Sequence, residues 1–225
     1  MNAHPLDHAV WLALNGRQRG LSEGNDVALR MRRDIGPFVA APDRSPDAVA
    51  AMAALIDDES YVMGDPPPAL PGVTVVSSAA GVQMVAEVPA PPPVTLDFVE
   101  LGDDDAPAML ELATLTKPGP FRTQTHRLGG FVGVKQRGRL VAMAGERFKP
   151  GNFCEVSGVC THPDARGQGL AGTLMRVVAD RIVARGEVPF LHAYASNVAA
   201  IALYERLGFR HRRMVTATVL AKTDG

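Results

Sequence analysis

The stretch Thr161-His162-Pro163-Asp164-Ala165-Arg166-Gly167-Gln168-Gly169-Leu170-Ala171-Gly172 decides how this 225-residue chain is expected to fold. It follows an apolar, strand-like segment and opens a segment whose apolar side chains recur at helical spacing. The first amides of a helix lack partners within the helix, and the helix dipole places partial positive charge on them. Glycines at 167 and 169 leave those amides open to an anion, and Arg166 adds a fixed charge. The stretch predicts a phosphate-binding helix start; a glycine-rich connection needed only for turning is the alternative.

Residues 167–172 also match the Gly-x-Gly-x-x-Gly motif, which is typical of dinucleotide-binding folds. An NAD-type oxidoreductase is therefore a second hypothesis. Three observations count against it. Residues 161–166 separate the glycines from the strand, the next strand ends without an acidic residue to hold a ribose, and the preceding strands are joined by short turns. Short turns predict antiparallel strands rather than the parallel strands of a dinucleotide-binding fold.

Working outward from the stretch, periodicity and Gly/Pro punctuation predict alternating helices and strands. The expected helices span 107–115, 170–184 and 197–207. The expected strands span 131–135, 139–147, 153–161, 188–194 and 209–220.

The N-terminal part differs from the rest of the chain in its clusters of proline residues. Proline clusters at 66–68 and 89–93 predict stiff connectors, and we place a domain boundary at residue 93, dividing the chain into 1–93 and 94–225. Ser45 is expected to cap a helix that continues to Ile56. The expected elements before the boundary are a helix over 4–14, strands over 27–33 and 38–41, and a hairpin of 73–77 with 82–88. Their order coarsely repeats that of the second part, so an internal duplication is one interpretation.

The amino-acid composition limits the classes of binding partner that are expected for this chain. With 46% hydrophobic and 21% charged residues and a formal net charge of −1, the chain is expected to be globular, without a nucleic-acid or membrane partner. Cys154 and Cys160 lie in one apolar segment and are expected to be buried free thiols rather than metal ligands. The first residues show no secretory signal, and no apolar run approaches the ~20 residues of a membrane span, so a cytoplasmic location is expected.

Two motifs in the second part resemble those of the GCN5-related N-acetyltransferase (GNAT) superfamily, in its FR47-like subgroup. The family's Arg/Gln-x-x-Gly-x-Gly/Ala motif is matched by Arg166, Gly169 and Ala171. Its Asn-x-x-Ala-x-x-x-Tyr motif is matched by Asn197, Ala200 and Tyr204. The likeness is dense over 139–210, thin over 94–138 and not visible before residue 93. It implies an α/β GNAT fold with a central mixed, largely antiparallel sheet flanked by helices. The parallel strands 153–161 and 188–194 would splay apart, and the smaller α/β N-terminal half would be a degenerate GNAT-like copy.

The resemblance implies direct transfer of an acetyl group from acetyl-CoA to a primary amine, on a small molecule or a peptide, with no metal. A non-catalytic CoA-binding regulator is the alternative of another class, and a homodimer is a compatible assembly. The pantetheine arm would lie between the splayed strands, with Gly158 marking a bulge that separates them. The implied cofactor-binding residues are Val159, Cys160, Thr161, Arg166, Gly167, Gln168, Gly169, Leu170, Ala171, Gly172, Asn197, Ala200 and Tyr204.

Three residues are candidates for proton transfer. By resemblance, Tyr204 is the general acid beside the CoA sulfur; its alternative role is an aromatic anchor of the helix. Glu155 is the leading candidate for the general base, because a carboxylate in an apolar central strand is costly unless it is paired or functional. Glu146 competes for that role, and either carboxylate could instead form a hydrogen-bonded pair. The loop 116–126 is expected to form a lid over the acceptor.

Overall fold

The computed structural model describes residues 4–57, 59–87 and 96–223. The helices and 3-10 turns are η1 (Pro5–His8), α1 (Ala9–Leu14), η2 (Arg19–Leu21), α2 (Pro46–Leu55), η3 (Asp103–Asp105), α3 (Ala106–Thr116), η4 (Thr125–Leu128), η5 (Pro163–Ala165), α4 (Leu170–Ala184) and α5 (Val198–Arg206). The strands are β1 (Ser22–Gly24), β2 (Leu29–Met31), β3 (Val39–Ala40), β4 (Ser60–Gly64), β5 (Val73–Ala86), β6 (Val99–Leu101), β7 (Phe131–Gln136), β8 (Arg139–Glu146), β9 (Phe153–Thr161), β10 (Val188–Tyr194) and β11 (Phe209–Lys222).

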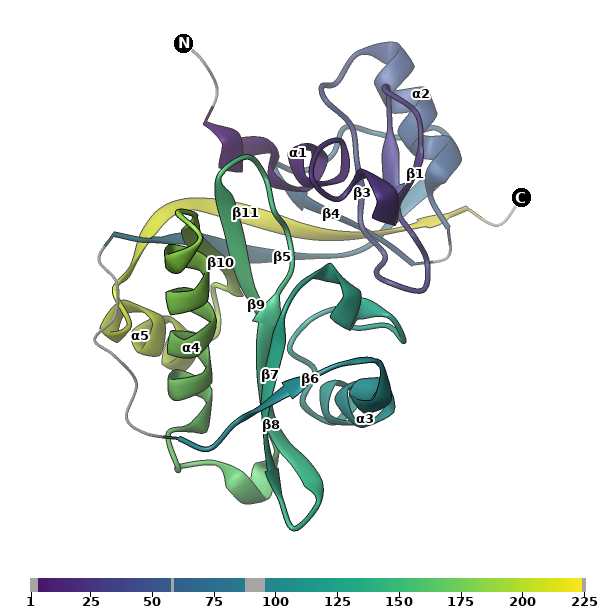
Figure 1. Cartoon of the computed structure of the whole chain (residues 1–225). Helices are drawn as coiled ribbons and strands as arrows, with labels where there is room; N and C mark the ends of the chain where they lie inside the picture. Colours follow the sequence, from purple (N-terminus) through teal and green to yellow (C-terminus); the bar gives the residue numbers. More distant parts are fainter. Residues whose placement is uncertain (1–3, 58, 88–95, 224–225) are drawn as a thin grey trace.

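One eight-stranded sheet organises the molecule, in the order β4-β11-β5-β10-β9-β8-β7-β6 (Figure 1). Its neighbours pair antiparallel except β10 and β9, which are parallel. A smaller three-stranded sheet, β1-β2-β3, lies in the N-terminal part. The mixed, largely antiparallel sheet expected from the sequence is therefore confirmed.

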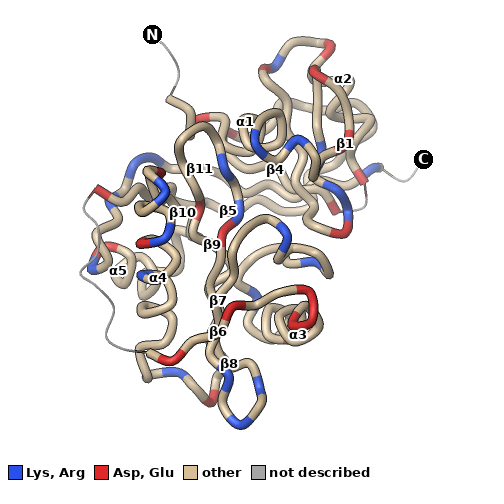
Figure 2. The backbone as a smooth tube through the Cα atoms, viewed as in Figure 1, with Lys and Arg blue, Asp and Glu red and all other residues tan. Residues whose placement is uncertain are grey.

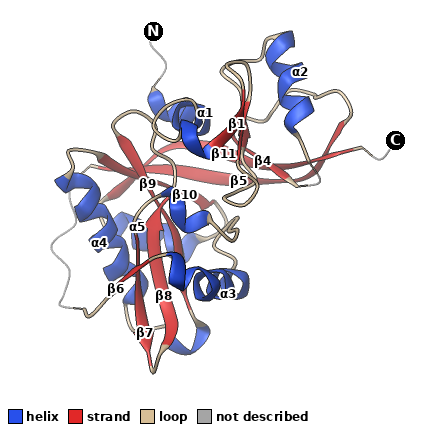
Figure 3. Ribbon diagram, turned by 45° about the vertical axis from the view of Figure 1, so that its right-hand side comes forward, coloured by secondary structure: helices blue, strands red, loops and turns tan. Residues whose placement is uncertain are grey.

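Helices cover both faces of the sheet (Figure 3). On one face, α4 buries Leu174, Val178 and Ile182 in the largest apolar cluster, which α5 also contacts. On the other face, α3 buries Met109 and Leu112 against β7, β8 and β9. In β7, Val132 and Val134 belong to the first cluster and Phe131 to the second, as the alternation of side chains along a strand requires.

The sheet corrects one expectation about the N-terminal part. Residues 73–77 and 82–86 do not form a hairpin; they belong to the single strand β5, in which Ala79, Ala80 and Gly81 pair with β11. Because β5 has partners on both sides, β10 and β11, the extended chain is held through the glycine. The boundary at residue 93, which lies outside the described residues, therefore does not separate two sheets. Whether the first half is a degenerate GNAT-like copy stays a prediction.

The N-terminal helices also share a core with the second part. The cluster combines residues before position 40 with Leu128, Phe148 and Phe190. The expected helix start at Ser45 is confirmed, since its hydroxyl accepts a hydrogen bond from the amide of Ala48 at 3.3 Å. Positive and negative residues are interspersed along the backbone (Figure 2). None of the helices in the described ranges is long and apolar enough to span a membrane.

Candidate active site

The parallel strands β9 and β10 separate partway along their length. Their pairing covers only Val188–Phe190 against Phe153–Glu155, although β9 continues to Thr161 and β10 to Tyr194. Beyond Glu155, the side of β9 that faces β10 therefore has no strand partner among the described residues. This opening corresponds to the splay expected at 153–161 and 188–194.

Gly158 lies where β9 departs from regular pairing. Met143 and Gly145 of β8 pair with Cys160 and Ser157, so β9 contains one more residue than β8 across this interval. Gly158 has φ +62°, and a Cβ there would lie 2.8 Å from the ring of Phe131. Glycine is required on both counts, and the bulge expected at this position is present.

The backbone of the loop before α4 is not covered by other atoms of the protein at its two glycines. Gly167 and Gly169 have φ +79° and +73°, and an added Cβ on either would meet no atom within 4 Å. Gly169 is the N-cap residue of α4, and no side chain caps the first amides of the helix. Arg166 and Gln168 are exposed beside it, while Leu170 is buried and anchors the helix start. No side chain covers these amides, an arrangement that suits an anion.

A cavity of about 220 Å³ passes through the splay. The helix side of its lining includes Met175, Asn197 and Tyr204, and the strands contribute Ser157, Gly158, Val159 and His192. Residues 116–120 line one side of the cavity, and the expectation that the loop 116–126 forms a lid over the acceptor stays a prediction. The cavity also extends over β4, β5 and β11, and there its lining consists of Tyr61, Met63, Gly81, Val215 and Ala217.

Tyr204 and Asn197 reach the cavity from α5. Burial raises the pKa of the Tyr204 phenol, which keeps its proton in place at neutral pH. Asn197 caps α5 by accepting a hydrogen bond from the amide of Ala200 at 3.2 Å. Ala200 itself is half-buried.

At the splay, residues 159–161 can contact a ligand mainly through their backbone groups, because the side chain of Cys160 and the hydroxyl of Thr161 are buried. The thiol of Cys160 is buried against α3, and burial raises its pKa to about 11, so it is an unreactive thiol. The hydroxyl of Thr161 is buried without a hydrogen-bond partner among the described residues. An orphaned buried hydroxyl beside an unpaired strand edge suits a polar ligand lying along β9.

Glu155 is held in a buried ion cluster. It is fully buried, and Arg147 donates to both of its carboxylate oxygens at 2.8 and 2.7 Å. His192 Nδ1 lies 2.7 Å from Oε1 of the same carboxylate. Burial would raise the pKa of Glu155, but the charge of Arg147 and the contact with His192 lower it to about 2. A carboxylate engaged on both oxygens and ionised well below neutral pH is a poor proton acceptor, so this arrangement counts against Glu155 as the general base, a role that stays a prediction.

Glu146, the last residue of β8, is also paired with cations. Its oxygens contact Lys149 and Arg185, each at 2.7 Å, and its side chain is 4% exposed. Burial opposes ionisation, but these two cations together lower its pKa. Glu146 forms the hydrogen-bonded pair that was its structural alternative, so it too is poorly suited to the role of general base.

A chain of hydrogen bonds continues from His192 toward the N-terminus. The amide nitrogen of Gln83 lies 3.0 Å from His192 Nε2 and donates to the carbonyl of Leu6 at 2.9 Å. The amide oxygen of Gln83 accepts from Arg212, which fixes the orientation of the amide. With a donor facing Nε2, the network fits the neutral imidazole that carries its proton on Nδ1.

Sequence reasoning missed Arg147 and the contribution of β4, β5 and β11 to the cavity. Arg147 follows Glu146 at a strand end, where nothing in the local pattern distinguishes it from a surface arginine. Its partner Glu155 is eight positions away, and only the pairing of β8 with β9 brings the two together. A charged residue expected inside an apolar strand was the one available signal, since it requires a partner of opposite charge.

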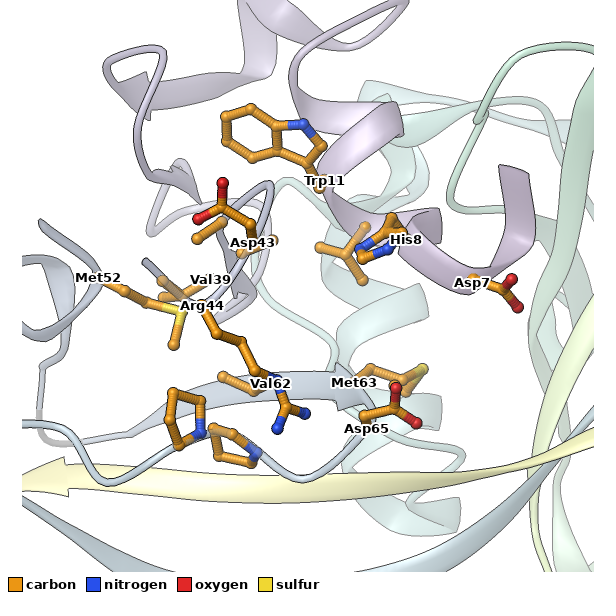
Figure 4. A pocket seen from close by; sticks show the side chains of 16 residues that line it. Asp7, His8, Trp11, Val39, Asp43, Arg44, Met52, Val62, Met63 and Asp65 are labelled. Carbon is orange, nitrogen blue, oxygen red and sulfur yellow. The ribbon is translucent and has the colours of Figure 1, made fainter. Parts of the chain in front are cut away.

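A second cavity, of about 110 Å³, lies between α1, β3 and β4, and Figure 4 shows Trp11 and Met52 among its lining. Its charged side chains are bonded within the protein: Asp65 to Arg213, and Arg44 to the carbonyl of Pro66 at 2.8 Å. We assign this cavity no role. Within residues 4–57, 59–87 and 96–223, no three His, Cys, Asp or Glu side chains cluster closely enough to hold a metal ion.

Comparison with known proteins places this geometry in a family. A family profile described as FR47-like protein matches residues 131–219. N-alpha-acetyltransferase RimI of Mycobacterium tuberculosis is 30% identical over 128 residues, which cover 52% of this chain and 79% of that protein. A solved structure from Novosphingobium aromaticivorans, assigned to the GNAT family as an acetyltransferase, is 47% identical over 99% of this chain and 100% of that one, with a TM-score of 0.92. A GCN5-related N-acetyltransferase from Kribbella flavida shares the fold over 99% of this chain and 98% of its own, at 18% identity and a TM-score of 0.65.

The profile match covers the splayed strands, the open start of α4 and the α5 motif together. The Gly-x-Gly-x-x-Gly spacing is thus part of an acetyltransferase loop rather than of a dinucleotide-binding fold. This chain belongs to the GNAT superfamily of N-acetyltransferases, in its FR47-like subgroup.

Proposed function

We propose that this protein transfers an acetyl group directly from acetyl-CoA to the primary amine of an acceptor. One observation carries the proposal: the cavity through the splay is lined by residues 156–159 of β9, and the uncapped, glycine-lined start of α4 follows the end of the same strand. The first suits a diphosphate, and the second suits a pantetheine arm that carries a thioester. The two buried free cysteines fit a reducing, cytoplasmic location.

The cofactor would be held mainly by backbone groups. Arg166 and the amides of residues 167–172 would bind the diphosphate, with Gly167 and Gly169 leaving room for it. The arm would extend β9 along Val159, Cys160 and Thr161, where β10 has moved away. Asn197 and Ala200 would line its far side at the start of α5.

Tyr204 is the proposed general acid. In the transfer, the amine nitrogen forms a bond to the thioester carbon, the C–S bond breaks, and the departing thiolate takes the phenolic proton. The amine releases one proton, so the protein regains its starting state when Tyr204 is reprotonated. A backbone amide near Val159 would stabilise the oxyanion.

We further propose that the acceptor enters as a neutral amine. Glu155 and Glu146 are both engaged by cations, and no Asp or Glu is among the residues that line the cavity through the splay. Lys117 and Arg147 do line it. A cationic surrounding disfavours an ammonium and favours the nucleophilic amine, so Glu155 would act as a positioning residue that holds Arg147 and His192.

Thermal shift and turnover measured side by side test the proposal. Acetyl-CoA at about a hundred times its dissociation constant is expected to stabilise the protein by about 2.7 kcal/mol, whereas NAD gives no shift. Acetyl-CoA is also expected to be consumed when a broad amine panel is added. Binding without transfer to any amine would instead favour the non-catalytic CoA-binding regulator, and protection by NAD alone would contradict both.

A further inference from the structure

One edge of the Arg147 guanidinium is left free inside the cavity. Its Nε and Nη2 donate to Glu155, and its central carbon lies 4.8 Å from the ring centre of Phe148 and 5.1 Å from that of Phe38. Arg147 is 8% exposed, it lines the cavity, and its Nη1 has no hydrogen-bond partner among the described residues. A buried guanidinium presents paired donors in a fixed geometry, and a vacant edge of this kind suits a carboxylate.

Two further side chains of the same cavity lining, Ser157 and Lys117, can donate hydrogen bonds. Ser157 lines the same cavity, and its hydroxyl makes no hydrogen bond to a described residue. Lys117 lies on the lid and forms no ion pair within the described ranges. Because the charge of Glu155 is already neutralised by Arg147, the only uncompensated charge along the described lining is the positive charge of Lys117. An anionic group on the acceptor would be attracted here, and a second ammonium group would be repelled.

Beyond these donors, the cavity becomes an apolar groove over strands from both parts of the chain. Small residues form its floor: Gly81 of β5 and Ala217 of β11. Tyr61, Met63 and Val215 supply larger apolar surfaces around that floor. Such a groove accommodates a hydrophobic side chain, with the phenol of Tyr61 as a further polar contact.

We propose that the acceptor is a free amino acid with an apolar side chain, whose carboxylate binds Arg147 Nη1, Ser157 and Lys117. The side chain lies in the groove over Gly81 and Ala217, and the α-amine faces the thioester in the splay. This inference rests on the proposed acetyl transfer and deepens it by naming the acceptor class. Acetylation then yields an N-acetyl amino acid and free CoA.

Three matched acceptor sets test the inference with the whole protein. Leucine, methionine and phenylalanine are each compared with the corresponding amide and the corresponding decarboxylated amine, with rates expressed per concentration of neutral amine. The free amino acids are expected to have kcat/KM values at least about tenfold above those of both analogues, as loss of one charge-assisted hydrogen bond predicts. Spermidine and a peptide with a free N-terminus are expected to be poorer still.

Variants locate the selectivity. Lys117→Ala and Ser157→Ala are each expected to raise KM for the amino acids about five- to tenfold, leaving KM for the decarboxylated amines and for acetyl-CoA unchanged. Lys222→Ala, a change at an exposed lysine on the end of β11, is the matched control and is expected to alter neither KM. The double variant Arg147→Met/Glu155→Gln removes the buried charges together and is expected to abolish the preference for a carboxylate.

The results of these experiments distinguish failure of the proposed acceptor class from failure of the proposed acetyl transfer. Equal kcat/KM for amino acids and decarboxylated amines, or a preference for peptides or polyamines, would overturn the acceptor class while leaving acetyl transfer in place. Retained selectivity in both Lys117→Ala and Ser157→Ala would overturn the assigned carboxylate site. Acetyl-CoA binding with no acetylation of any amino acid in the panel would also refute the inference, whereas absence of any response to acetyl-CoA would refute the proposed function itself.

Discussion

Glu155 shows how far the meaning of one side chain depends on what surrounds it. Within its strand it is a lone carboxylate between apolar residues, and that pattern alone indicates either pairing or chemistry. The structure supplies the partners Arg147, which follows β8, and His192 of β10, and both contact the carboxylate, which favours an anchoring role over that of a proton acceptor. The charge was predictable from sequence as a feature that needs explanation. Its role was not, because both partners are brought to it only by sheet pairing.

The buried cluster predicts a specific dependence of stability on pH. The folded pKa of Glu155 is depressed from its usual 4.5 to about 2, so its contribution is present above about pH 4.5 and is lost as the pH falls toward 2. Glu155→Gln is expected to lower the free energy of unfolding by about 3 kcal/mol at neutral pH, because Arg147 loses its buried counter-charge. Urea denaturation across this range should show the difference from wild type shrinking as the pH drops.

A surface carboxylate provides the control for that experiment. Glu100 pairs with Arg181, but its side chain is 67% exposed, so Glu100→Gln is expected to change the free energy of unfolding by less than about 0.5 kcal/mol. Equal losses for the two variants would mean that the Glu155 cluster is not energetically distinct from a surface ion pair.

Tyr204 carries the sharpest catalytic prediction. Tyr204→Phe removes only the phenolic oxygen, while the ring that packs against the core stays in place. We expect kcat to fall about a hundredfold, the lower range of general acid catalysis, with the dissociation constant of acetyl-CoA nearly unchanged. Steady-state kinetics with a parallel binding titration measures both. Unchanged kcat would leave Tyr204 only its packing role.

Among the elements, those with their own start and stop signals were the most predictable. The bounds of α4 follow from its apolar periodicity and from Gly186 after its end, and the observed helix spans the expected residues 170–184. The break expected in β5 was wrong, because Ala79, Ala80 and Gly81 have the composition of a turn but all pair with β11, and Gly81 also pairs with β10. Local propensity determines the secondary structure of a segment that has no neighbouring strands. Within a central strand, pairing with the neighbouring strands overrides that propensity.

The two ends of α4 offer a matched pair of substitutions. Gly169 at its start and Gly186 after its end have φ +73° and +76°, and an added Cβ would meet no atom within 4 Å at either. Replacing either glycine with leucine is therefore expected to cost a similar amount of stability, about 1 kcal/mol. Only Gly169→Leu is expected to weaken acetyl-CoA binding, by about tenfold or more, since its side chain would cover the free amides.

Isothermal titration with acetyl-CoA distinguishes the two sites, with thermal unfolding of each variant as the check on folding. If Gly169→Leu bound acetyl-CoA as tightly as Gly186→Leu, the start of α4 would not be the phosphate site.

Over the whole molecule, the two parts of the chain form one structural unit. Proline clusters and a thinning of the family likeness suggested a boundary at residue 93, but neither signal reports on strand order. In the structure β5 lies between β10 and β11, and Phe190 of the second part packs in a core made largely by residues before position 40. The acceptor side of the cavity likewise draws on β4 and β5. Such long-range pairing leaves little trace in local sequence patterns.

A truncation tests this unity. The fragment 94–225 lacks β4 and β5, so β10 loses one partner strand and β11 loses both. We expect the fragment to show no cooperative thermal unfolding. A full-length chain cut at a protease site inserted after residue 87 is the control, and it should remain folded because sheet pairing joins the two pieces. A fragment that unfolds cooperatively and binds acetyl-CoA would instead establish 94–225 as an independent domain.

A crystal structure with bound acetyl-CoA would show where the cofactor lies. We expect the diphosphate on the backbone amides of residues 167–172, the pantetheine arm between β9 and β10 beside Val159 and Thr161, and the thioester sulfur within hydrogen-bonding reach of the Tyr204 hydroxyl. Density for acetyl-CoA elsewhere on the protein, with the amides at the start of α4 unengaged and the splay empty, would contradict this expectation.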